Sequence, residues 1–229
     1  MNRISLVTCA AMVATLAFTS CRSPEPRLDT GTLELLNGED LKGWRFILAD
    51  PAVPRDAVWS VLDGNLVCTG TPLGVLQTER SFTNFRLVVE YRWAPGGKPG
   101  NSGILTRING EARALPRCVE VQLQHGSAGD VLGLQGMAVG PEQPRAFEIK
   151  AHKVAGDIHG VKKLADAEKP GGEWNRVEIL AQGGNYTVWM NGRQINQATG
   201  AEIVAGPIGL QSEGGEIHFR RATLTPLPD

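Results

Sequence analysis

The chain has 229 residues, 41% of them hydrophobic and 21% charged, and its formal net charge is −1. This length suits a single globular domain, and the near-neutral charge, without a block of basic residues, argues against a nucleic-acid partner. The sequence has no glycine-rich dinucleotide-binding fingerprint, so oxidation with a dinucleotide cofactor is not expected of this chain.

The N-terminal segment has the pattern of a secretory signal peptide. Arg3 supplies a positive charge, and residues 4–18 form an apolar run that is short for a membrane span. Cys21 follows small residues and is placed like the lipid-attachment cysteine of a bacterial lipoprotein; ordinary cleavage nearby, with an incidental thiol, is the alternative. We therefore expect a lipid anchor in the bacterial cell envelope, facing the periplasm or the cell surface. The expected segments are a lipoprotein signal peptide over 1–20, a polar tether over 21–31 and a folded domain over 32–229.

Alternation of apolar and polar residues dominates the chain after residue 32. Turn dipeptides typical of hairpins separate such runs at Asp63-Gly64 and Asn191-Gly192. Helical periodicity is missing, and only 166–169 has room for a single helical turn. With 28 glycines and 14 prolines, this pattern predicts an all-β fold, a two-sheet antiparallel jelly-roll sandwich. The predicted strands are 59–62, 65–68, 75–78, 85–93, 104–108, 118–124, 147–152, 175–181, 186–191, 208–211 and 217–225.

Two segments, 126–145 and 153–173, are longer than a hairpin needs. Loops of that length in a compact domain are usually functional or mobile, and both follow predicted strands, so they could wall one end of a groove. Two cysteines stay in the mature domain, Cys68 and Cys118. In an oxidising compartment they could pair, but two buried free thiols are equally compatible with the sequence.

The predicted strand over 118–124 places a polar row on one face of the sheet. Val119, Val121 and Leu123 point to one side and Glu120, Gln122 and Gln124 to the other. One carboxylate followed by two amides suits the floor of a groove that binds hydroxyls, as in a sugar. The row has a single carboxylate, whereas retaining glycosidases use two that are about 5–5.5 Å apart.

Several segments, in order, resemble the 3-keto-disaccharide hydrolase domain family over roughly residues 33–227. The resemblance implies a concanavalin A-like jelly roll, similar to laminarinase-type glycosidases, and activity on glycosides oxidised to a ketone at C3. Many members of the family carry Asp-His where this chain has Ser212-Glu213, which leaves the substrate of this branch open. The motifs are residues 36–44, Asn101-Ser102-Gly103-Ile104 with Arg107, Glu120-Val121-Gln122, Gly129-Asp130, Glu173-Trp174-Asn175, Asn191-Gly192 and residues 206–214.

A single carboxylate suffices for β-elimination. The C3 ketone acidifies the hydrogen on C2, and loss of the C1 substituent then breaks the glycosidic bond. Glu120 is the expected base, with Arg107 donating to the C3 oxygen and His125 protonating the leaving group. Arg107 is the expected donor because it shares a strand face with Asn101 in a regular strand. An ion pair of Glu120 with an arginine on a solvated face is the alternative.

The expected substrate-binding residues carry hydrogen-bonding or aromatic side chains. Asp130 and Glu213 could equally be turn residues, and Trp174 could pack in the core. No cofactor is expected; a divalent metal on His152, Asp157 and His159 is a weaker alternative, and no spacing matches a structural zinc site. The substrate-binding candidates are Asn101, Gln122, Gln124, Asp130, Trp174 and Glu213.

Three functions follow, in order of preference. The first is cleavage of 3-keto-glycosides, with a small carbohydrate as substrate. The second is a lectin-like sugar-binding module, because a fold does not by itself establish activity. The third is an ordinary glycosidase in which Asp130 or Glu213 supplies the second carboxyl group.

Overall fold

The computed structural model describes residues 31–140 and 144–228. The expected signal peptide and the lipid-attachment residue Cys21 lie outside the described residues. Within the described part of the chain, no helix is long and apolar enough to cross a membrane.

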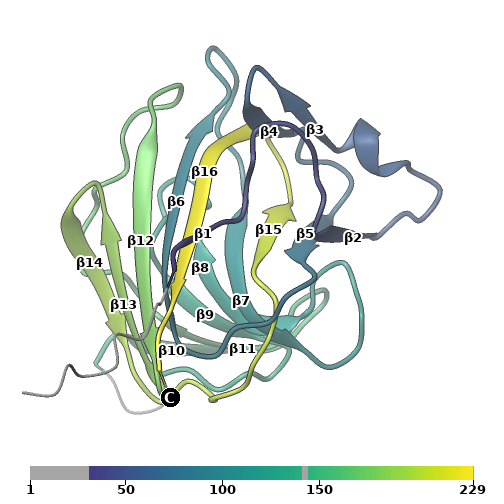
Figure 1. Ribbon diagram of the computed structural model, residues 1–229. Helices are drawn as coiled ribbons and strands as arrows, with labels where there is room; N and C mark the ends of the chain where they lie inside the picture. The colour runs from purple at the N-terminus through teal and green to yellow at the C-terminus, as the bar shows by residue number, and fades with distance from the viewer. Residues whose placement is uncertain (1–30, 141–143, 229) are drawn as a thin grey trace, which may run out of the picture.

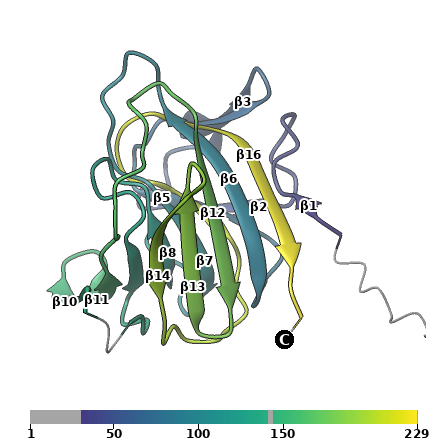
Figure 2. The same cartoon turned by 90° about the vertical axis from the view of Figure 1, so that its left-hand side faces the viewer.

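The strands form two antiparallel eight-stranded sheets that pack face to face (Figures 1 and 2). The first sheet has the order β14 (Arg193–Ala198), β13 (Asn185–Met190), β12 (Asn175–Gln182), β6 (Phe85–Trp93), β16 (Ile217–Pro226), β4 (Asn65–Cys68), β3 (Trp59–Leu62), with β1 (Leu33–Glu34) paired to β16. The second sheet has the order β10 (Ala146–His152), β11 (Gly156–Val161), β9 (Val131–Leu134), β8 (Arg117–Gln122), β7 (Gly103–Asn109), β15 (Gly209–Ser212), β5 (Gly74–Thr78), β2 (Trp44–Leu48). This architecture confirms the predicted all-β two-sheet sandwich.

The main core fills the space between the sheets. Val119 and Val121 on β8 and Val89 on β6 are fully buried in it. Because side chains alternate along a strand, burying these valines turns Glu120 and Gln122 to the outer face of the second sheet. There a second, smaller apolar cluster forms around Leu105. The alternation read from the sequence therefore sets the direction in which the polar row faces.

The long segments are not plain loops. Segment 126–145 contains β9 and segment 153–173 contains β11, and β11 pairs with both β9 and β10. These strands were missed because β9 is buried along its whole length and β11 contains two glycines, so neither alternates. The β10–β11 hairpin forms the edge of the second sheet opposite β2 (Figures 1 and 2). Residues 166–169 form no helix; the described chain has only a 3-10 turn at Arg55–Ala57.

Cys68 and Cys118 are both buried free thiols. Cys68 lies in the core between the sheets, whereas Cys118 belongs to the cluster on the outer face of the second sheet. Burial raises the pKa of both thiols. Because the second sheet separates the two clusters, Cys68 and Cys118 do not form a disulfide and are two buried, unreactive thiols.

Candidate functional site

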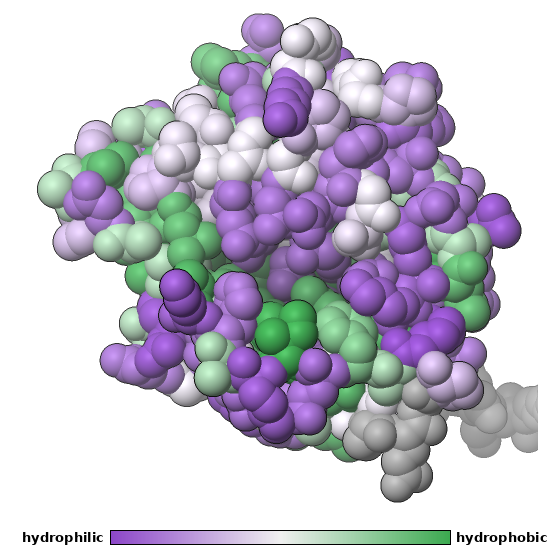
Figure 3. Space-filling model, turned by 180° about the vertical axis from the view of Figure 1, so that it is seen from behind, coloured by the Kyte–Doolittle hydropathy of each residue, from purple (hydrophilic) through white to green (hydrophobic). Residues whose placement is uncertain are grey.

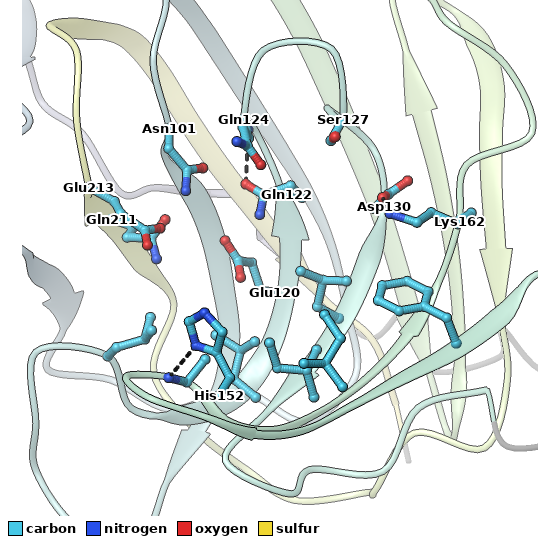
Figure 4. Close-up of a pocket in the computed structure, with 17 residues that line it drawn as sticks. Asn101, Glu120, Gln122, Gln124, Ser127, Asp130, His152, Lys162, Gln211 and Glu213 are labelled. Carbon is cyan, nitrogen blue, oxygen red and sulfur yellow. Dashed lines mark hydrogen bonds and ion pairs between the residues drawn. The ribbon is translucent and has the colours of Figure 1, made fainter.

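A pocket of about 230 Å³ opens on the outer face of the second sheet. β8 forms its floor, β15 and the following residues form one side, and β9 with the β10–β11 hairpin forms the other. The two long segments therefore wall the groove, as expected. Figure 3 shows the hollow from outside, and Figure 4 shows its lining side chains.

Glu120 lies at the centre of the pocket and is only 2% exposed (Figure 4). Leu105 on β7 and Leu132 on β9 lie directly opposite it in the sheet. Its Oε1 has no hydrogen-bond partner among the described residues. Burial, and secondarily the charge of Glu213, raise the pKa of Glu120 to about 8. A strongly shifted carboxyl group in a pocket is a typical feature of a functional site.

Gly103 makes room for this carboxyl group. A Cβ at position 103 would overlap Oε1, Cδ and Cγ of Glu120. Position 103 of the Asn101-Ser102-Gly103-Ile104 motif therefore needs a glycine for steric reasons, because the Glu120 side chain crosses the neighbouring strand there.

We expect Gly103→Ala to lower the rate of a reaction that uses Glu120 by about 10²-fold, because an added methyl group pushes the Glu120 carboxyl group out of position. Turnover and circular dichroism of the variant check this. Gly31→Ala is the matched control, since a Cβ there meets nothing within 4 Å. Unchanged turnover in Gly103→Ala would contradict the proposed packing.

A second carboxyl group, that of Glu213, lies beside Glu120. Hydrogen bonds to its backbone carbonyls hold this segment: Asn101 N–H donates to the Gly214 carbonyl over 2.7 Å, and the Ser102 hydroxyl donates to the Gln211 carbonyl over 2.8 Å. Burial raises the pKa of Glu213, and the Gln211 side chain partly offsets this. Glu213, one of the expected substrate-binding residues, thus lines the pocket.

Amide groups surround the two carboxyl groups. Asn101 has a buried Oδ1 without a partner in the described chain. The Gln122 Oε1 accepts the backbone N–H groups of Leu123 and Gln124 at 2.9 and 2.8 Å, so its amide nitrogen is the end left to donate. Asn101, Gln122 and Gln124 all line the pocket, as expected for groups that bind hydroxyls.

Asp130 also lines the pocket, but both of its carboxylate oxygens already accept hydrogen bonds. It is 3% exposed, its Oδ2 accepts from Lys162 Nζ over 2.9 Å and its Oδ1 accepts the Lys163 N–H over 2.8 Å. This pairing ties β9 to the end of β11 and leaves Asp130 poorly suited to act as an acid or base. Lys162, which the sequence did not indicate, brings a positive charge to the pocket wall.

The expected role of Arg107 as a donor to the substrate is wrong. Arg107 has φ +53° at a bulge between β7 and β8, which turns its side chain to the opposite face. Its fully buried guanidinium donates to the carbonyls of Thr83, Gly183 and Glu202 and lies over the Tyr186 ring. The regular alternation assumed for this strand breaks at the bulge.

We expect Arg107→Met to lower the free energy of unfolding by about 3 kcal/mol or more, because it leaves three buried carbonyls without donors. Urea unfolding measures this. Arg45→Met, at an exposed arginine on β2, is the matched control and should have little effect on stability. If the folded Arg107 variant instead loses turnover at wild-type stability, a substrate role would return.

His125 and Trp174 do not line the pocket either. His125 Nδ1 pairs with Glu168 Oε2 at 2.9 Å. Trp174 lies between the guanidinium groups of Arg92 and Arg220, each 4.6 Å from its ring centroid. The structure therefore does not bring His125, the expected acid for the leaving group, or Trp174, an expected sugar-binding residue, into this pocket.

The trio considered as an alternative metal site, His152, Asp157 and His159, is not grouped, but one of its members lines the pocket. Asp157 accepts the Ala151 N–H, and His159 lies 3.5 Å from Glu148; the described residues contain no group of three His, Cys, Asp or Glu side chains suited to a metal. His152 borders the pocket, with its Nδ1 accepting the Ala155 N–H over 3.0 Å (Figure 4). A neutral ring then carries its hydrogen on Nε2.

A groove lined with buried carboxyl groups and amides on one sheet of a jelly roll suits a protein that binds or cleaves carbohydrates. Over residues 31–225 the chain matches the model of the 3-keto-alpha-glucoside-1,2-lyase-like domain. The chain therefore belongs to this family, as the sequence motifs indicated. A comparison with curated proteins found no match.

Solved structures share the fold. A "putative glycosyl hydrolase" from Parabacteroides distasonis aligns with a TM-score of 0.61 at 20% identity, covering 86% of this chain and 94% of that one. The carbohydrate-binding module CBM66 from Bacillus subtilis has a TM-score of 0.54 at 13% identity, covering 80% and 95%. LamAcat from Zobellia galactanivorans has a TM-score of 0.52 at 7% identity, covering 81% and 92%. These similarities support the jelly-roll fold.

Proposed function

We propose that this protein cleaves 3-keto-glycosides by removing the C2 proton and eliminating the C1 substituent, with Glu120 as the base. The observation that carries this proposal is the unpartnered, desolvated Glu120 carboxyl group at the centre of the pocket. A carboxylate whose pKa lies near 8 is a much stronger base than an exposed one, and catalysis is best when that pKa approaches the working pH.

The reaction needs no oxidant. Glu120 accepts the proton from C2, the electrons of that C–H bond form the C1–C2 double bond, and the C1–O bond breaks towards the leaving oxygen. That oxygen takes up a proton, giving an alcohol and an unsaturated 3-keto sugar. Addition of water to the double bond completes a net hydrolysis.

The donors for this chemistry are amides and an imidazole in place of the predicted arginine. Asn101 and Gln122 can donate to the C3 oxygen, where the enolate charge develops. His152 Nε2–H is suited to protonate the leaving oxygen, because Nδ1 is held by the Ala155 N–H. Burial, and secondarily the charge of Glu213, keep the pKa of Glu120 high.

The test is a comparison of oxidised and unoxidised sugars. We would incubate residues 22–229 with 3-keto-trehalose, 3-keto-glucosides and their parent sugars, and follow sugar release and absorbance of a conjugated ketone. Cleavage of the oxidised sugars alone is the expected result. Cleavage of plain β-glucan would favour an ordinary glycosidase, for which Glu120 and Glu213 would be the two carboxyl groups.

A sugar-binding module is the second candidate. The amide-rich lining and the structural similarity to CBM66 support it. Tight binding of unoxidised sugars, without turnover of any oxidised one, would establish this function.

The pH dependence of kcat/KM separates a base from an acid. With Glu120 as the base, kcat/KM should rise with pH through an inflection near pH 8 and level off above it, where the carboxyl group is ionised. Glu213→Gln should move this inflection to lower pH, because the Glu213 charge contributes to the raised pKa. A rate that falls through pH 8 would make Glu120 an acid.

We also propose that lipid on Cys21 tethers the domain to the cell envelope, facing the periplasm or the cell surface. Metabolic labelling with a fatty-acid analogue should mark the protein and should fail in Cys21→Ser. Labelling that persists in that variant would refute the anchor.

A further inference from the structure

The pocket around Glu120 has two chemically different sides. Amide and carboxyl groups gather on the side of β15 and of the turn between β8 and β9, where Figure 4 labels them. The unlabelled apolar side chains gather on the opposite side, with His152 at the border. The main contributors to this apolar wall are Leu132, Leu134, Phe147, Ile149 and Ile158.

The apolar wall is a built surface that stays partly open. Leu132, Leu134 and Ile158 belong to the cluster on the outer face of the second sheet, and Phe147 packs against it. Ile149, however, is 43% exposed. Figure 3 shows hydrophobic atoms accessible in the hollow. An accessible apolar patch that continues a binding pocket usually marks where a ligand is buried.

We propose that this wall binds the leaving group of the substrate, and that this group is an apolar ring, alicyclic or aromatic, and not a second sugar. The inference rests on the proposed cleavage at Glu120. A second sugar would press hydroxyl groups against alkyl side chains that neither donate nor accept hydrogen bonds, which is costly. An apolar ring gains from the same burial.

The position of His152 fits this assignment. Its ring lies between the carboxyl groups and the apolar wall (Figure 4). The scissile oxygen joins the sugar to its leaving group, so it would lie at this border. The sugar ring then contacts the amides, and the apolar ring contacts the hairpin formed by β10 and β11.

The experiment compares 3-keto-glucosides whose leaving groups are all primary alcohols, so that their acidity is similar: methyl, cyclohexylmethyl and the 1→6-linked glucosyl compound. We expect kcat/KM for the cyclohexylmethyl compound to exceed that of the disaccharide at least about tenfold. Ile149→Gln should reduce the ratio of cyclohexylmethyl to methyl cleavage several-fold. Leu164→Gln, at an exposed leucine that does not line the pocket, is the matched control and should leave that ratio unchanged.

Equal or better cleavage of the disaccharide, or an unchanged ratio in Ile149→Gln, would overturn the inference. If even the methyl compound is not cleaved, the proposed function fails instead. Calorimetric binding of unoxidised cyclohexylmethyl glucoside and of the matching disaccharide then decides the leaving-group site separately. Preferential binding of the apolar glucoside supports the site, and equal affinities refute it.

Discussion

Replacing Glu120 by Gln is expected to lower the cleavage of 3-keto-glycosides by about 10³-fold or more while leaving substrate affinity nearly unchanged. Gln has almost the same shape but cannot accept the C2 proton, and positioned general bases typically contribute 10²–10⁴-fold. Calorimetric affinity and single-turnover rates, measured on the same preparation, separate the two effects. The comparison is decisive because Glu120 has no partner among the described residues whose loss would disturb the pocket.

Glu79→Gln is the matched control, since Glu79 is an exposed carboxylate that does not line the pocket. It should retain full turnover. A Glu120→Gln protein that still cleaves 3-keto-glycosides at the wild-type rate would exclude Glu120 as the base and direct attention to Glu213.

The same Glu120→Gln substitution is expected to stabilise the protein at alkaline pH. The pKa of Glu120 is raised from 4.5 to about 8 in the folded state, so the folded protein holds a proton that the unfolded chain releases. Wild-type stability should therefore fall as pH rises from about 4.5 through 8, whereas Gln, which does not ionise, avoids this loss. At pH 9 the variant should be more stable by an amount on the order of 3–5 kcal/mol.

Urea unfolding of both proteins at pH 5, 7 and 9 tests this expectation. The difference in unfolding free energy should be small at pH 5 and should grow with pH. Two stability curves that run parallel from pH 5 to 9 would mean that the Glu120 carboxyl group ionises normally. Lost activity together with gained stability would be the pattern of a site that holds a destabilised functional group.

β8 was predictable from its alternation of apolar and polar residues, whereas β9, which consists of apolar residues and a glycine, was not. The alternation in β8 correctly turned Glu120 and Gln122 away from the core. β9 contains only apolar residues and a glycine, so it has no alternating pattern and the sequence predicts a loop there. The hairpin that builds the apolar wall of the pocket was only half predicted, because β11 contains two glycines and does not alternate.

The candidate site was predicted where the backbone is regular. Glu120 and Gln122 line the pocket as expected, because the regular strand β8 sets their direction. Asn101 and Gln124, just outside β7 and β8, line it as well. Arg107 does not, because a bulge with φ +53° reverses its side. Nothing in the local sequence marks that bulge.

The sequence by itself determined the jelly-roll class, the family and the face that carries the polar row, since all three follow from local alternation and from motifs in order. Only the tertiary structure decided which distant groups meet. It placed Glu213 beside Glu120, removed His125 and Trp174 from the groove, and brought His152 to its border. The pKa of Glu120 depends on the same packing, because desolvation and neighbouring charge come from strands far apart in the chain.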